Sequence, residues 1–124
     1  MKPKQILTPD YLTGKWRVTA FYLYTNLGWK LTKQYGLNCF LWDISSDGKL
    51  LEKRKDTLDF ITTYSQTGDE LFIDRTNFDR GNILSLNSRY RIQPINETEC
   101  FLYDLENITI GAKDSQYRLK LKRI

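Results

Sequence analysis

The feature of this sequence that most constrains its fold is a succession of short β-rich runs separated by turn residues. The runs are rich in aromatic and β-branched residues, and turn residues break them roughly every ten positions, a spacing typical of β-sandwiches and β-barrels. No stretch keeps apolar residues at the helical period over the length that an amphipathic helix requires. We therefore predict an all-β protein with eight strands, at about residues 16–24, 37–44, 49–55, 57–65, 70–75, 83–92, 99–105 and 116–123.

Turn residues between these runs favour short antiparallel connections. Asp47-Gly48 lies between the second and third runs and is a strong signal for a tight hairpin. Gly68 and Gly81 occupy the breaks after the fourth and fifth runs. Strands joined by short turns pair with their neighbours in the chain, so we expect an up-and-down order.

A chain of 124 residues is most simply a single domain, and its core is large enough to fold without metal or disulfide staples. We treat residues 1–124 as one domain whose first part, residues 1–10, is an extended segment. Hydrophobic residues make up 40% and charged residues 27%, which argues against disorder and against a membrane protein. No apolar run approaches the ~20 residues that span a bilayer, so we expect no transmembrane segment.

The N-terminal residues include basic side chains but no apolar stretch of the kind that export signals require. Two interpretations stay open on this observation. The protein is either cytoplasmic or the processed form of an exported protein.

The residue types that usually carry catalysis or bind metals are scarce. The chain contains no histidine, which removes the commonest metal ligand and the commonest general base. Cys39 and Cys100 are far apart and are equally compatible with buried thiols and with a disulfide. No cluster of Asp, Glu and Cys has metal-site spacing. We predict no enzymatic activity, no metal and no cofactor.

The net charge of +4 raises the question of nucleic-acid binding, because Lys and Arg neutralise phosphates. The basic residues are interleaved with acidic ones along most of the chain, and residues 117–124 form the single dense basic cluster. A solvated charged surface explains this distribution. We therefore predict no nucleic-acid partner.

Alternation with a period of two residues assigns faces to the strands. One face is apolar and aromatic and the other is mixed or charged, as in a barrel wall. The predicted inward set comprises Phe40, Trp42, Ile44, Leu58, Phe60, Thr62, Tyr64, Phe101, Tyr103, Leu105, Tyr117, Leu119, Leu121 and Arg123. The first run alternates imperfectly, because Phe21 and Leu23 share a face with Arg17 and Thr19. A bulge or a cover over that strand would account for this.

The chain resembles the lipocalins and the wider calycin group. The resemblance rests on the Gly-x-Trp of Gly14 and Trp16 at the head of the first strand, followed by eight short strands. It is most similar to compact bacterial lipocalin-like domains, because the interval 26–36 is too short for the two-helix lid of fatty-acid-binding proteins. The resemblance implies an eight-stranded antiparallel up-and-down β-barrel. Bacterial members are often exported, which implies the cell envelope or periplasm if the chain is a processed form.

Closure of such a barrel makes the first and last strands neighbours. Parity puts Arg123 on the inward set, where it would stack on Trp16 and, with Gly14, close the barrel floor by a cation–π contact. Lipocalins use an arginine near the end of the chain in this way. Arg118 is the alternative to Arg123 for this role.

The resemblance further implies a small ligand above the floor. The aromatic side chains expected to line the ligand space are Tyr22, Tyr24, Phe40, Trp42, Phe60, Tyr64, Tyr90 and Tyr103. The interval 26–36 would form a loop at the mouth that carries Trp29, Lys30, Lys33 and Tyr35, and its lysines would favour an anionic ligand. We predict non-enzymatic binding of a small hydrophobic or amphipathic ligand. The alternative is a protein-interaction module, such as an inhibitor, an immunity-type protein or an envelope accessory protein, with a barrel filled by side chains.

Overall fold

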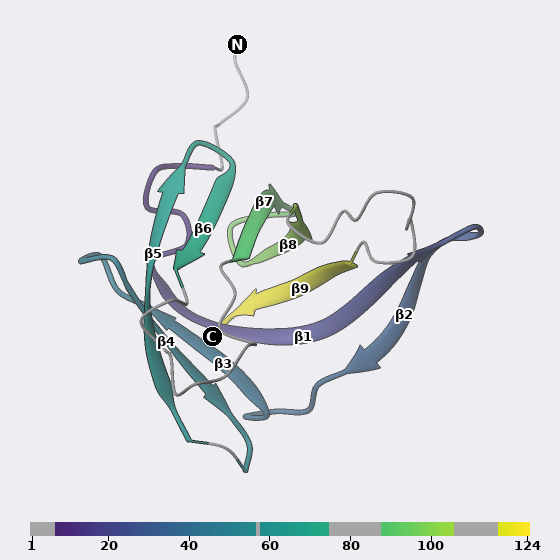
Figure 1. Ribbon diagram of the computed structural model, residues 1–124, viewed down its shortest axis with the longest axis horizontal. Coiled ribbons are helices and arrows are strands. Elements are labelled where there is room, and N and C mark those ends of the chain that lie inside the picture. Colours follow the sequence, from purple (N-terminus) through teal and green to yellow (C-terminus); the bar gives the residue numbers. More distant parts are fainter. Residues whose placement is uncertain (1–6, 57, 75–87, 106–116) are drawn as a thin grey trace.

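The computed structural model describes residues 7–56, 58–74, 88–105 and 117–124 (Figure 1). Within these residues the protein consists of nine strands and the turns between them, with no helix. The strands are β1 Gly14–Thr25, β2 Gly28–Gln34, β3 Phe40–Ile44, β4 Lys49–Arg54, β5 Phe60–Thr67, β6 Glu70–Asp74, β7 Ser88–Pro94, β8 Glu99–Asp104 and β9 Tyr117–Arg123.

The strands form one antiparallel sheet that closes on itself. Each strand from β3 to β9 pairs with the next, and β9 pairs with β1. β3 pairs with the start of β1 and β2 pairs with the same edge of β1 further along, so β2 and β3 together act as one interrupted strand of the wall. The result is a closed barrel of eight antiparallel strands in up-and-down order, which confirms the predicted fold class.

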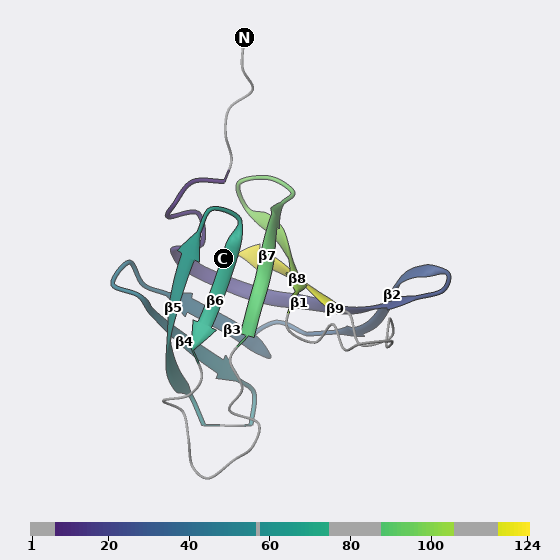
Figure 2. The same ribbon diagram turned by 45° about the horizontal axis from the view of Figure 1, so that its top comes forward.

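The presence of strand β2 contradicts the prediction for the interval 26–36. The interval 26–36 was predicted to be a loop at the mouth, but most of it is strand, paired with β1 from Ala20 to Thr25. A tight turn at Asn26 and Leu27 reverses the chain, and Gly28 adopts a φ of 102°, which favours glycine. Thr25 supports the turn, because its hydroxyl donates to the carbonyl of Gly28 and accepts from the N–H of Leu27. The β1–β2 hairpin extends beyond the other strands to one side of the barrel (Figures 1 and 2).

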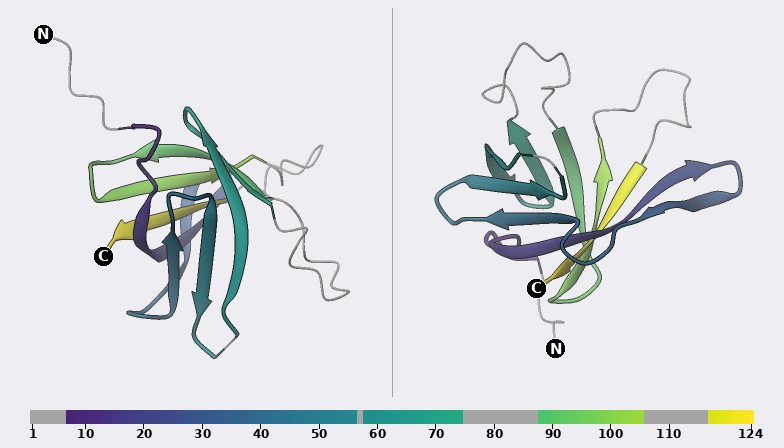
Figure 3. Two further views of the ribbon diagram at one scale, coloured as in Figure 1. Left: turned by 90° about the vertical axis from the view of Figure 1, so that its left-hand side faces the viewer. Right: turned by 90° about the horizontal axis from the view of Figure 1, so that it is seen from below.

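The core lies inside the barrel, and its strand residues come from β1, β3, β4 and β6 to β9. Figure 3 shows the strands of the wall arranged around this interior. Its buried members on the strands are Trp16, Val18, Phe40, Trp42, Ile44, Leu50, Leu71, Ile73, Tyr90, Ile92, Cys100, Leu102, Leu119 and Leu121. The predicted faces of two runs agree with this set, because the inward residues of 40–44 and of 117–121 are buried or half-buried. In the run 57–65 Thr62 is buried and Ile61 exposed, as predicted, but the inward assignment of Leu58 is wrong, because Leu58 precedes β5 and is 77% exposed. Burial of this apolar surface is the main stabilising contribution to the barrel.

A bulge in β1 reverses the predicted faces of Tyr22 and Tyr24. The register against β9 shifts between Val18 and Ala20, so that Phe21 lies opposite the buried Leu119 and Tyr22 lies opposite Arg118. One extra residue in a strand moves every later side chain to the other face. The expectation that these tyrosines face inward is therefore wrong, and both point to the outside of the barrel.

The face predicted for β8 is also wrong. Cys100, Leu102 and Asp104 are buried, and Phe101 and Tyr103 alternate with them on the outer wall. Both faces of this strand carry apolar side chains, so alternation alone does not indicate which face is inside. The two aromatic rings are half-buried because other side chains cover them on the outside.

Candidate functional site

Trp16 and Arg123 close one end of the barrel, as parity predicts. The guanidinium carbon of Arg123 lies 4.2 Å from the centroid of the Trp16 ring. Arg123 also donates to the carbonyls of Thr13 at 2.8 Å and of Tyr11 at 2.6 Å. A Cβ atom at Gly14 would lie only 2.7 Å from Nη1 of Arg123, so the close approach requires glycine. The alternative residue, Arg118, lies elsewhere on the wall.

Two buried groups beside the floor are held in their neutral forms. The hydroxyl of Tyr11 donates to the carbonyls of Asn96 and Glu99, and burial raises the pKa of this tyrosine. Burial also raises the pKa of the Cys100 thiol to about 12. Both Cys39 and Cys100 are free thiols, which decides between the two states that the sequence left open. The floor is therefore a packed structural element.

The inward residues predicted to line a ligand space pack against one another. Phe40 and Trp42 are 4% and 1% exposed, and Trp42 Nε1 donates to Oε1 of the buried Glu52 at 2.9 Å. Arg54 donates to the second oxygen of the same carboxylate at 3.2 Å and covers the Phe40 ring at 4.1 Å. The charge of Glu52 is thus matched by hydrogen bonds on both oxygens.

Three tyrosines elsewhere on the wall are similarly engaged. The hydroxyl groups of Tyr90 and Tyr117 lie 2.9 Å apart, and the Tyr64 hydroxyl donates to the carbonyl of Ser45 at 2.7 Å. The side chain of Phe60 lies outside the described residues. The interior side chains named here are therefore in contact with their neighbours.

Residues predicted for the mouth of the barrel separate into two groups. Tyr35 packs edge-on against Phe40 with ring centroids 5.2 Å apart, and Lys33 lies 5.1 Å from the Tyr35 ring. Burial raises the pKa of Tyr35. Lys30 is exposed on β2, and Trp29 turns over the outer wall of the barrel.

The outer wall of β1, β8 and β9 holds four aromatic rings around one arginine, which we call the Arg118 cluster. The guanidinium carbon of Arg118 lies 4.0 Å from the centroid of the Phe101 ring, 4.7 Å from Trp29, 4.8 Å from Tyr22 and 5.6 Å from Tyr103. Arg118 Nη1 also donates to the Tyr103 hydroxyl at 2.9 Å, whereas its buried Nε has no hydrogen-bond partner among the described residues. These contacts fasten the β1–β2 hairpin to β8 and β9, because Trp29 reaches across to Tyr103.

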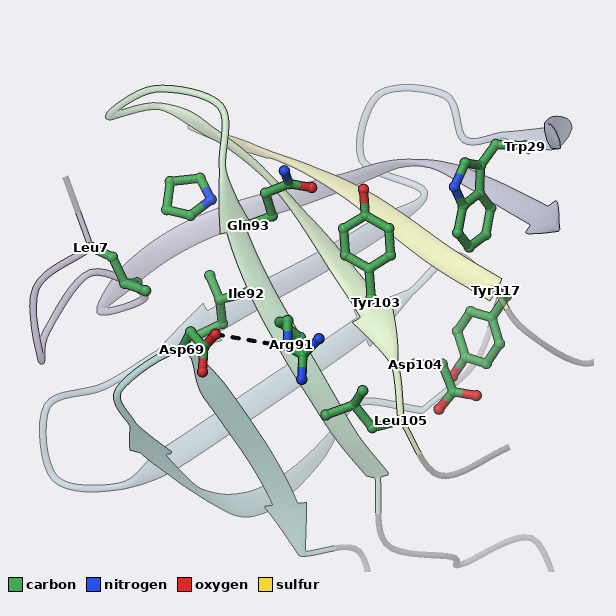
Figure 4. Close-up of a pocket in the computed structure, with 11 residues that line it drawn as sticks. Leu7, Trp29, Asp69, Arg91, Ile92, Gln93, Tyr103, Asp104, Leu105 and Tyr117 are labelled. Carbon is green, nitrogen blue, oxygen red and sulfur yellow. Dashed lines mark ion pairs between the residues drawn. The ribbon is translucent and has the colours of Figure 1, made fainter. Parts of the chain in front are cut away.

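A groove of about 520 Å³ begins at this cluster and crosses the outer wall of β7 and β8 (Figure 4). We call it the outer groove. Trp29 and Tyr103 lie at one end, Leu7 and Asp69 lie at the other, and Arg91 stands between them (Figure 4). Its remaining lining residues are Ile92, Gln93, Pro94, Asp104, Leu105 and Tyr117.

Arg91 is the central charge of the outer groove. Its Nε lies 3.7 Å from a carboxylate oxygen of Asp69, and both side chains are more than half exposed, at 59% and 55%. Exposed ion pairs of this kind contribute little and exchange readily with solvent or other ions. Arg91 is therefore placed to contact an anion in the groove.

The sequence analysis predicted Tyr103 in the interior and Trp29 at the mouth, and it named Arg118 only as the alternative to Arg123 at the floor. It did not identify Arg91. Cross-strand register is what joins them, because Arg91, Tyr103 and Arg118 lie opposite one another on three adjacent strands. The bulge in β1 then adds Tyr22 to the same row. The imperfect alternation of residues 16–24 was the one signal in the sequence that pointed to this outer face.

The described residues contain no group of acidic or cysteine side chains arranged to hold a metal ion. They also contain no helix that is long and apolar enough to cross a membrane. Neither the protein-family models nor the curated proteins with which the chain was compared match it. The closed eight-stranded barrel is nevertheless consistent with a calycin-like fold.

Proposed function

We propose that this lipocalin-like barrel binds a small amphipathic anion in the outer groove and carries out no chemical reaction on it. The observation that carries the proposal is the groove itself, which joins an aromatic end to an exposed arginine. Its volume of about 520 Å³ falls within the range of small-molecule sites. The proposed ligand site thus lies on the outer wall, whereas the sequence predicted a site among the interior side chains.

The aromatic end of the groove suits a planar or apolar ligand body. Trp29 and Tyr103 lie with ring centroids 5.6 Å apart at 68°, so one ring meets the other edge-on. Arg118 lies behind both rings and fixes their positions. A preorganised aromatic site of this kind loses little conformational entropy on binding.

The polar part of the groove suits a negatively charged head group. Arg91 presents a guanidinium that is only weakly engaged by Asp69. The Tyr103 hydroxyl accepts a hydrogen bond from Arg118, which leaves its own proton for an acceptor on the ligand. A hydroxyl that accepts from a cation is a stronger donor, because hydrogen bonds in a chain polarise one another.

A binding role is favoured over catalysis by the chemistry of the groove. The chain has no histidine, and of the three charged residues in the described groove lining Asp69 and Arg91 are exposed to water, so the buried Asp104 has no second buried acid or base among the lining residues. General acid–base catalysis instead relies on groups whose pKa values are tuned by burial or by close partners.

The test is a fluorescence titration with 8-anilinonaphthalene-1-sulfonate, a planar aromatic anion. We expect saturable binding at one site, and we expect Arg91→Gln to weaken it about tenfold, since one charge-assisted contact of this kind is worth about 1.4 kcal/mol. Lys53→Gln is the matched control, because it removes the same charge from an exposed position on β4. Amide chemical shifts should change at Arg91, Gln93 and Tyr103.

Two results would contradict the proposal. One is equal affinity for the wild type and Arg91→Gln. The other is a set of chemical-shift changes centred on the inward residues Phe40, Trp42 and Tyr90, which would return the ligand to the barrel interior.

A further inference from the structure

β2 is the one strand of the described sheet that pairs on a single side. Strands β3 to β9 each have neighbours on both sides, and β1 is bordered by β9 and by β2 and β3, whereas β2 pairs with β1 alone. In an antiparallel ladder alternate residues direct their N–H and C=O groups away from the neighbouring strand. The far edge of β2 therefore presents unpaired backbone groups to solvent among the described residues.

The position of the hairpin makes this edge accessible. The β1–β2 hairpin extends away from the barrel in both views (Figures 1 and 2). Most side chains of β2 are exposed, and the turn before it carries Leu27, which is 99% exposed. An open strand edge is a template on which an extended chain adds as a further strand.

The charge on this edge indicates the kind of chain that fits. Lys30 lies opposite Leu23, and Lys33 lies opposite Phe21, because the register shift in this pairing makes Thr32 an extra residue. Both lysines thus lie on one face of the hairpin, at about the 7 Å spacing of alternate strand residues. Leu31 and Trp29 lie on the other face, opposite Tyr22 and Tyr24.

A second copy of the chain is a poor occupant of this edge. Pairing β2 with β2 would bring the lysines of both copies together, and lysines on an edge are a common protection against such pairing. The whole chain also carries a net charge of +4. Charge complementarity favours an acidic partner.

We propose that the free edge of β2 binds an extended segment of a partner protein in which acidic residues alternate with apolar ones. The segment adds to the sheet as a strand beside Gly28–Gln34. Its carboxylates face Lys30 and Lys33, and its apolar side chains pack beside Leu31, which is 44% exposed. This site shares Trp29 with the outer groove, but the backbone edge of β2, Lys30, Lys33 and Leu31 are not among the groove's lining residues, and the site does not depend on the proposed ligand.

The probe is a seven-residue peptide, acetylated and amidated, with glutamate at alternate positions and valine or threonine between them. We expect saturable binding to the ¹⁵N-labelled protein, with shifts and slowed hydrogen exchange at the amides of residues 28–34. The double variant Lys30→Glu and Lys33→Glu should bind this peptide at least about tenfold more weakly. It should also gain binding of the matched peptide that carries lysine in place of glutamate.

Matched variants keep the test specific. Lys49→Glu with Lys53→Glu changes the charge by the same amount on exposed positions of β4 and should leave peptide binding unchanged. Thermal unfolding of each variant checks that the barrel is intact. Arg91→Gln should also leave this binding unchanged, which separates the edge from the groove.

Any of four results would overturn the proposal. The first is that the acidic peptide shows no saturable binding at millimolar concentration. The second is that it binds the variant with Lys30→Glu and Lys33→Glu as tightly as the variant with Lys49→Glu and Lys53→Glu. A third is that its chemical-shift changes centre on Arg91, Gln93 and Tyr103 of the outer groove. The fourth is that the amides of residues 28–34 shift with protein concentration in the absence of peptide, which would make a second copy the occupant.

Discussion

The contact between Gly14 and Arg123 yields a prediction whose size follows from the structure. In Gly14→Ala the new Cβ atom would lie 2.7 Å from Nη1 of Arg123, at a residue whose φ is 128°. The backbone strain alone costs about 2 kcal/mol. Displacing the guanidinium weakens its bonds to Thr13 and Tyr11 and its stacking on Trp16, which adds about 2 kcal/mol. We expect Gly14→Ala to lower the free energy of unfolding by about 4 kcal/mol.

A double-mutant cycle separates the two contributions. Arg123→Ala alone should cost about 3 kcal/mol, because it leaves two carbonyls without their donor and uncovers the Trp16 ring. In that background Gly14→Ala should cost only the backbone strain of about 2 kcal/mol, which gives a coupling energy of about 2 kcal/mol. Urea unfolding followed by tryptophan fluorescence measures all four proteins. An equal cost of Gly14→Ala in both backgrounds would refute the assigned contact.

Three further predictions concern the wall and the core. Arg118→Gln should speed hydrogen exchange of the β2 amides while lowering global stability by only about 1–2 kcal/mol, because the arginine fastens the hairpin through cation–π contacts; unchanged exchange would argue against that fastening. Glu52→Gln should cost about 2 kcal/mol in urea unfolding, because the buried carboxylate accepts charge-assisted bonds from Trp42 and Arg54; Glu70→Gln, on an exposed residue, is the matched comparison. Burial raises the pKa of Cys100 from 9.0 to about 12, so its stabilising contribution is complete below about pH 9 and is lost as the pH rises toward 12; Cys100→Ser should flatten the fall in stability over that range, and a fall of equal steepness would contradict the assignment.

The alternation of residues 40–44 and 117–123 predicted the inward set correctly, because each of those runs has one clearly apolar face. The same logic failed for Tyr103, since both faces of β8 carry apolar side chains. It failed for Tyr22 because a single extra residue near Thr19 changes the face of everything after it. Local alternation of apolar and polar residues indicates that a segment is a strand. It does not show which face each side chain takes after a bulge.

The sequence by itself determined the fold class, the closure of the floor and the broad chemistry. Short alternating runs joined by tight turns suffice for an up-and-down barrel, and parity alone placed Arg123 on Trp16. Tertiary structure alone decided where the proposed ligand and partner sites lie. The row of Arg91, Tyr103, Arg118 and Tyr22 exists because four strands distant in sequence pair in one register. β2 has a free edge because β1 extends beyond the part of the barrel wall that the other strands form. How far β1 extends beyond them is determined only when the strands pair and the barrel closes.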